Sequence, residues 1–396
     1  AVAPDLSFPG DKFRPDWLYG FLRKPHPIRP WLKIRMPSFR LTEEEAVALV
    51  RHLSRDMRQR RLPPLPAEPE WSESEKKARL EAGRKLMSEE YFGCWECHQR
   101  GEKKPEGPME NWAPDLEISS RRLRPEWIVR WLKNPQQWMP GTKMPSYFED
   151  ADSGPEEILD GDETKQIYAI RDYILSLSPP AKKPSAFEQA KQRYPKANRA
   201  YGARLMSELN CAGCHEVGGM HEREEAGPPL AHEGSRVKRD WLVRFLKKPS
   251  KYRPLGYVAG AASRMPDFRL SEEEARAITA YFMTRMDKRT AALENSRATR
   301  RERAQRGARL YAALRCEACH RGARDGKRPK SGIHLEGPDL SHAGRRLKEK
   351  HLRLWLAGEV TRSGSELEMD AHPLVPKLGL TREQIADLAA YLATRT

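Results

Sequence analysis

The chain has 396 residues, and a single compact core rarely extends over that length, so we expect two to four domains. Its hydrophobic fraction of 38% and aromatic fraction of 8% are low for a globular protein of this size, which leaves room for a large apolar cofactor in each domain. The net charge is +16, but Lys and Arg alternate with 56 acidic residues and form no long block. We therefore expect a basic surface that docks an acidic partner, and no nucleic-acid binding.

The sequence has no apolar stretch that approaches the roughly 18 residues of a membrane-spanning helix. It begins at Ala1 without the basic and apolar segments of an export signal. We expect that such a signal has been removed and that the protein is periplasmic or otherwise extracytoplasmic. Membrane association through partners or through an anchor further upstream stays open.

Residues 1–65 contain four features in a fixed order. These are a Pro-Asp-Leu segment at 4–6, Trp17 in an expected helix, a loop at Met36-Pro37, and an acidic-capped helix expected at 42–55. A stiff, proline-rich linker follows.

Residues 72–180 repeat this order and place two features before it. A helix that contains Gly83 leads into a Cys-x-x-Cys-His motif at 94–98. The remaining features then follow: Pro-Asp-Leu at 114–116, Trp127, Met144-Pro145, and a helix at 162–177 that contains Tyr173. A second proline-rich linker ends this unit.

The same order occurs again in residues 186–290 and 295–396. Gly202 and Gly307 precede Cys-x-x-Cys-His motifs at 211–215 and 316–320. A repeat of about one hundred residues predicts three tandem domains, with residues 1–65 as a partial copy that lacks the attachment motif.

All six cysteines belong to the three Cys-x-x-Cys-His motifs. In this spacing the two thiols lie about one turn apart and can both bind the vinyl groups of a haem, and the adjacent histidine can bind its iron. The motifs therefore predict three c-type haems, held by Cys94, Cys97, Cys211, Cys214, Cys316 and Cys319, with His98, His215 and His320 as axial ligands. Structural zinc, a thioredoxin-like redox pair and a disulfide scaffold are the alternatives.

Taken together, these motifs make each unit resemble a class I cytochrome c domain. The resemblance covers nearly the whole chain and implies an all-α fold. It also implies that the first and last helices of each unit cross where a glycine meets an aromatic residue. The corresponding pairs are Gly83 with Tyr173, Gly202 with Tyr281, and Gly307 with Tyr391.

The methionine loops predict the second axial ligands. Met144 and Met265 lie where the family places this ligand, after the tryptophan helix. In the third unit a valine, Val375, takes this position, so Met369 or His372 is expected to bind the iron, with an open site as a further alternative. His372 would give a haem of lower potential than Met369.

Met36 has the same sequence context, but its segment has no haem motif. Its role as a ligand therefore depends on where a haem comes from. A missing upstream segment with a fourth motif is the preferred explanation, and a haemless remnant or completion by a neighbouring protein are the others.

The predicted function is electron transfer along a chain of haems, as a subunit or partner of a membrane respiratory complex within a larger assembly. We expect an electron carrier and not an enzyme. The alternatives are a haem enzyme that uses the altered third site, a subunit of an extracellular haem filament, and a zinc-binding interaction module.

Overall fold

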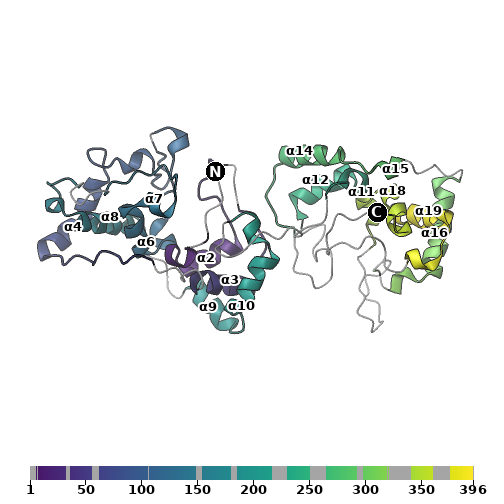
Figure 1. Cartoon of the computed structure of the whole chain (residues 1–396), viewed down its shortest axis with the longest axis horizontal. Coiled ribbons are helices and arrows are strands. Elements are labelled where there is room, and N and C mark those ends of the chain that lie inside the picture. The colour runs from purple at the N-terminus through teal and green to yellow at the C-terminus, as the bar shows by residue number, and fades with distance from the viewer. Residues whose placement is uncertain are drawn as a thin grey trace. The chain divides into compact units, whose positions relative to one another are not determined.

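The computed structural model describes residues 6, 8–32, 36–55, 62–105, 107–148, 154–179, 185–215, 230–249, 265–291, 298–318, 320, 340–359 and 375–395. Within these ranges the secondary structure consists of helices, short 3-10 turns and isolated β-bridges, and there is no strand (Figure 1). The prediction of an all-α fold is confirmed. The chain separates into two units, Ala1–Glu222 and Arg223–Thr396, which are described one at a time.

Two names simplify the description of the repeats. The attachment half holds the glycine helix and the Cys-x-x-Cys-His motif. The methionine half is the part from the Pro-Asp-Leu segment to the last helix.

Helices α4 (Glu73–Leu86) and α8 (Glu163–Ser176) cross in the first unit. A Cβ atom at Gly83 would overlap the carbonyl oxygen of Ala169 and the side chain of Tyr173, so only glycine allows this approach. The pairing of Gly83 with Tyr173 is confirmed. Helix α6 (Pro125–Lys133) packs on α8 and closes the core with the buried residues Ile128, Val129 and Leu132.

The other core of this unit is built from two segments that are far apart in the sequence. Helices α2 (Pro15–Arg23) and α3 (Glu43–Arg55) pack against α9 (Ala186–Arg193) and α10 (Arg199–Glu208). Figure 1 shows purple α3 beside teal α10.

The partner of Gly202 differs from the one that the sequence order predicted. A Cβ atom at Gly202 would overlap the carbonyl oxygen of Ala48 and the side chain of His52, so α10 crosses α3. The pairing of Gly202 with Tyr281 is therefore wrong in this structure. The physical reason is that α3 presents the small, fully buried Ala48 in the register that the crossing needs. The methionine half at residues 1–55 thus packs with the attachment half at 185–215, although the domain boundaries themselves stay predictions.

Helices α16 (Arg300–Ala313) and α19 (Arg382–Thr394) form the corresponding crossing in the second unit. Gly307 faces Asp387 and Tyr391, which confirms the predicted pairing of Gly307 with Tyr391. Arg306 Nε lies 2.7 Å from Asp387 Oδ2 across this crossing. Helix α18 (Glu349–Ala357) packs on α19.

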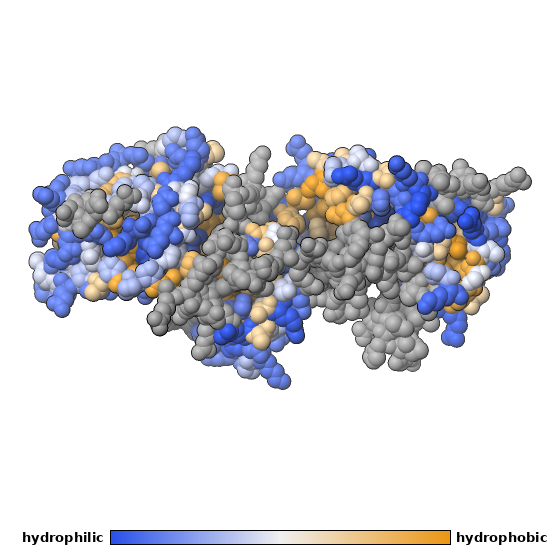
Figure 2. Space-filling model, viewed as in Figure 1, coloured by the Kyte–Doolittle hydropathy of each residue, from blue (hydrophilic) through white to orange (hydrophobic). Residues whose placement is uncertain are grey.

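The remaining methionine half contains α12 (Arg239–Lys247) and α14 (Glu272–Met283). Tyr281 is 55% exposed, whereas its counterparts Tyr173 and Tyr391 lie in the crossings described above. Ala277 is exposed, although Ala48 and Ala169, at the same helical position, are fully buried. Figure 2 shows hydrophobic surface gathered over α12 and α14.

Each unit joins its two methionine halves in the same way. Phe13 pairs with Leu123 in an antiparallel bridge, and Val237 pairs with Leu347 in another. A side-chain hydrogen bond also repeats at equivalent places: Arg124 Nε to Gly10 O at 2.9 Å and Lys348 Nζ to Gly234 O at 2.6 Å. The short helices at or beside these contacts are α1 (Pro9–Lys12), α5 (Ser119–Arg122), α11 (Glu233–Arg236), α15 (Lys288–Ala291) and α17 (Ala343–Arg346), while α7 (Pro135–Trp138) follows α6.

Candidate haem-attachment sites

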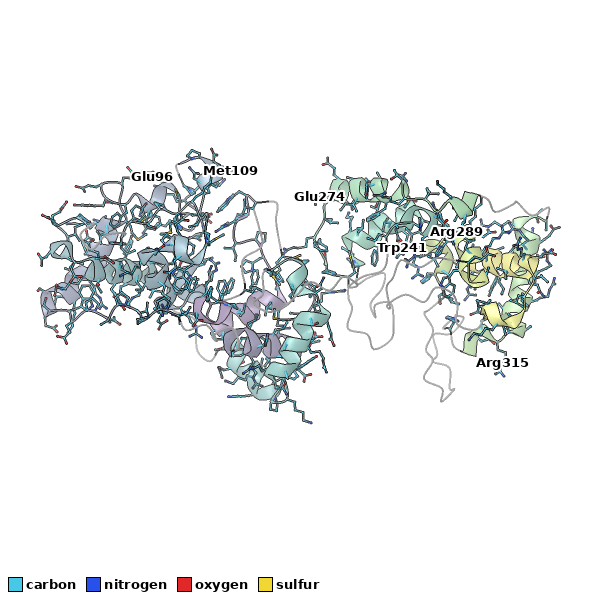
Figure 3. All side chains as sticks on the ribbon, in the orientation of Figure 1. Glu96, Met109, Trp241, Glu274, Arg289 and Arg315 are labelled. Carbon is cyan, nitrogen blue, oxygen red and sulfur yellow. The ribbon has the colours of Figure 1, made fainter. Side chains whose placement is uncertain are left out.

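The three Cys-x-x-Cys-His motifs begin with the same backbone turn. The residue before each motif has a left-handed conformation, with φ of 56° at Gly93, 50° at Asn210 and 53° at Arg315. A 3-10 turn follows in each case: η2 (Cys94–Glu96), η5 (Cys211–Gly213) and η6 (Cys316–Ala318). Figure 3 labels Glu96 inside the first motif and Arg315 directly before the third.

A backbone hydrogen bond closes each motif. The N–H of the histidine donates to the carbonyl of the first cysteine, at 2.9 Å for His98, 3.0 Å for His215 and 2.9 Å for His320. The first cysteine and the histidine are thereby held one helical turn apart. This is the arrangement that covalent attachment and axial ligation of one haem require.

His98 is oriented by the Pro-Asp-Leu loop. Its Nδ1 donates to the carbonyl oxygen of Pro114 at 2.8 Å, which leaves Nε2 as the ring nitrogen that can bind iron. Burial is the largest effect on its pKa and lowers it, so the imidazole is held in the neutral form that a metal ligand needs. The N–H of Ala113 donates to the carbonyl of Cys97 at 2.7 Å and joins the same loop to the motif.

Burial favours the protonated form of three thiols, Cys94 and Cys97 in the first motif and Cys211 in the second. Burial raises the pKa of Cys94 to about 12 and that of Cys211 to about 11, and it also raises the pKa of Cys97. Reactive thiols of redox enzymes have a lowered pKa, so these sites differ from a thioredoxin-like pair. Across the described ranges we find no cluster of three His, Cys, Asp or Glu side chains placed to hold a free metal ion.

Met144 lies on the same core as Cys94 and is half-buried. Trp131 Nε1 lies 2.8 Å from Met144 Sδ and donates a hydrogen bond to it, while the hydroxyl of Tyr147 donates to the carbonyl of Phe92 at 2.8 Å. Trp131 was not among the predicted site residues. Its signal was the spacing of four residues from Trp127, which places both rings on one face of α6.

Arg122 provides a test of whether the first unit fits a haem. Its guanidinium lies 5.3 Å from the ring centres of both Phe13 and Trp17, and its buried Nε has no hydrogen-bond partner within the described part of the chain. Burial, together with the charge of Arg29, lowers the pKa of Arg122 to about 10. A half-buried cation with one buried, unused donor fits a haem propionate. These observations and the donor set of two thiols and one imidazole fit the group.

The second motif, at 211–215, lies on the same hydrophobic core as Met36. Cys211 packs on the core that residues 1–55 share with 185–215, and Met36 and Phe39 pack on the same core. Met265, the ligand predicted from sequence order, belongs to the unit Arg223–Thr396, where it is 37% exposed.

The third motif is described in part. His320 is buried, and Cys316 packs on the core formed by α16 and α19 with their neighbours. Burial raises the pKa of Tyr311, on α16, to about 12. Cys319 and the two predicted ligands Met369 and His372 lie outside the described residues.

The comparisons with known proteins found one family. Residues 199–285 and 304–396 match the family model named Cytochrome c. No curated protein and no solved structure was found to match. The first matched region runs from α10 to α14, and the second runs from α16 to α19.

Proposed function

We propose, from the premise that residues 199–285 and 304–396 are two tandem regions of the cytochrome c family, that the whole chain carries electrons along three c-type haems. The observation that carries this proposal is the shared turn of the three motifs, in which the histidine N–H donates to the first cysteine. The motif at 94–98 lies outside the matched regions and has this same turn.

Haem, when bound, supplies the one-electron chemistry, and the protein sets its ligation, burial and surroundings. In the first unit, Cys94 and Cys97 would hold the haem covalently, and His98 and Met144 would bind its iron. The carbonyl oxygen of Pro114 fixes the orientation of the His98 ring. A site closed by histidine and methionine favours electron transfer over catalysis, because the iron keeps no open position for a substrate.

The proposed partners are redox proteins with an acidic surface, including a membrane respiratory complex. The net charge of +16 supports this choice, since opposite charges steer association. None of the helices that the structure describes is both long enough and apolar enough to cross a membrane. We place the protein in the periplasm or another extracytoplasmic space because covalent haem attachment is typical of those compartments.

Stopped-flow oxidation of the reduced protein by an acidic redox protein tests this function. We expect fast oxidation of the haems, with a second-order rate that falls as salt rises because the steering charges are screened. A basic acceptor is the matched control, and its rate should rise or stay constant with salt. The absence of any oxidation by either acceptor would rule out the proposed role.

A further inference from the structure

The four methionine halves outnumber the three attachment halves, so one methionine loop has no haem motif of its own within this chain. Sequence order, together with the family match that covers residues 199–285 as one region, gives Met265 to the motif at 211–215 and leaves Met36 without a haem motif of its own. The packing of the first unit points to a different assignment.

Residues 1–55 and 185–215 form one hydrophobic core. Met206, Leu205 and Ala197 on the attachment side are 1%, 2% and 0% exposed, and they share this core with the fully buried Val47 and Val50 on α3. Such close packing across two segments indicates a stable pairing, since buried apolar surface is the main source of stability.

Polar contacts join the same two segments at both ends of α9. Asp16 Oδ1 accepts hydrogen bonds from Ser185 Oγ and from the N–H of Phe187, each at 2.9 Å. At the other end of α9, Arg193 lies 2.7 Å from the carboxylate of Glu43.

A further hydrogen bond fixes the position of α3 against the start of α10. The guanidinium of Arg51 donates to the carbonyl oxygen of Ala197 at 2.5 Å. Together with the contact of Gly202 and Ala48, this bond sets the register in which α10 enters the haem-attachment turn.

Aromatic residues stand at the same sequence positions before Met36 as before Met144. Phe21 stacks on Trp17 with ring centres 4.9 Å apart, as Trp131 stacks on Trp127 at 6.5 Å, and Phe245 stacks on Trp241 in the same way before Met265. Aromatic residues three positions after each methionine also correspond: Phe39 packs on the core that contains Leu209, as Tyr147 packs on Phe92 at 4.7 Å. Leu209 and Phe92 each lie two residues before the first cysteine of their motif.

We infer that Met36 is the axial sulfur ligand of the haem at Cys211, Cys214 and His215, and that Met265 is not. The inference rests on the proposed function, because it requires a haem at this motif. Met265 is 37% exposed and Tyr281 is 55% exposed, which agrees with this inference, since α14 packs on α11 and α12 and, within the described residues, on no attachment helix.

The test uses the full chain loaded with haem. Met36→Leu removes the sulfur and keeps the side-chain volume, and Met265→Leu is the matched control. The haem content per chain is measured by the pyridine haemochrome spectrum. The number of methionine-ligated haems is measured from the strongly shifted S-methyl resonances in the NMR spectrum of the reduced protein.

We expect Met36→Leu to remove one shifted S-methyl resonance and to lower one midpoint potential, while the haem content stays the same. Met265→Leu should change neither. Met36→His should restore a six-coordinate haem with two imidazole ligands, which separates loss of the ligand from loss of the fold.

The inference is overturned if Met36→Leu keeps every shifted resonance or if Met265→Leu removes one. These outcomes differ from a failure of the proposed function. In that case the unmodified protein itself would have no c-type haem.

Discussion

Arg122, a half-buried cation in the first unit, is the residue whose charge we expect to affect a haem potential. Arg122 stacks on Phe13 and Trp17 and holds a buried Nε without a hydrogen-bond partner in the residues that are described. Arg121, beside it on the same short helix, is exposed. Substitutions at Arg122 and at Arg121 remove the same net charge, so a comparison of the two separates the effect of the charge's position on the haem potential from that of net charge.

Replacement of Arg122 by Gln should lower the midpoint potential of one haem. The loss of a positive charge near the ring favours the ferric state, and a partly buried charge is worth about 1 kcal/mol, or about 40 mV for one electron. Spectroelectrochemical titration measures the potential. Arg121→Gln is the control and should leave all potentials within a few millivolts, and equal shifts in both variants would contradict the role of Arg122.

We expect His351 to make the second unit sensitive to acid. Burial is the main cause that lowers its pKa to about 3, and the charges of Arg236 and Arg346 add to the effect. On unfolding the ring returns to its ordinary pKa of about 6.5, so the unfolded state binds more protons between about pH 6.5 and pH 3. Stability is therefore lost as the pH falls through this window, by at most about 2 kcal/mol at pH 5.

We expect His351→Gln to reduce the loss of stability between pH 7 and pH 5. Denaturant unfolding at both pH values measures the free energy of unfolding. His26 is exposed, and the variant His26→Gln, measured in the same way, controls for the loss of one histidine. An unchanged pH dependence in His351→Gln would show that this imidazole does not carry the effect.

At the scale of the helices, the crossing of α10 and α3 can be tested by substitution at Gly202. A Cβ atom at Gly202 would overlap the carbonyl oxygen of Ala48, and a backbone atom cannot move aside cheaply. Gly20, on α2, has no atom within 4 Å of the corresponding position. Both glycines lie inside helices, but only Gly20 has room for a Cβ atom.

Gly202→Ala should destabilise the protein by about 1–3 kcal/mol, the usual effect of overpacking a tight contact. Gly20→Ala should stabilise it by about 0.5–1 kcal/mol, because alanine is the better helix former. Thermal unfolding monitored by circular dichroism measures both. Equal stabilisation by the two substitutions would mean that Gly202 does not face a neighbouring backbone.

A second pair of substitutions identifies the helix on which α10 packs. Ala48 is fully buried on α3, and Ala277 is exposed at the same position of α14. We expect Ala48→Leu to lower the unfolding temperature of the core that contains α3 and α10. Ala277→Leu should leave this temperature unchanged. The reverse result would assign α10 to α14.

Much of the local structure follows from the sequence. Capping boxes at Ser72, Ser271, Thr299 and Thr381 begin helices where serine or threonine precedes an acidic or amide residue by three positions. The partner of α10 does not follow in this way. Helices α3, α8, α14 and α19 share one register, so the sequence offers equivalent crossing faces, and only packing distinguishes Ala48 from Ala277.

At the scale of the whole molecule, the resemblance to class I cytochrome c domains implies the all-α fold, and the three attachment motifs can be read directly from the sequence. The Gly-aromatic crossing was predicted correctly for Gly83 and Gly307 and incorrectly for Gly202. The joining of methionine halves through Phe13 with Leu123 and Val237 with Leu347 was not predicted. Its residues are ordinary apolar side chains, and no motif marks them as contacts between repeats.

The haem content per chain is the quantity that tests the central claim most directly. A pyridine haemochrome spectrum of the purified chain, divided by the protein concentration from amino-acid analysis, gives this number. We expect three c-type haems per chain, and two after the double substitution Cys94→Ala and Cys97→Ala. A spectrum without the c-type band, or bound zinc in its place, would contradict the account.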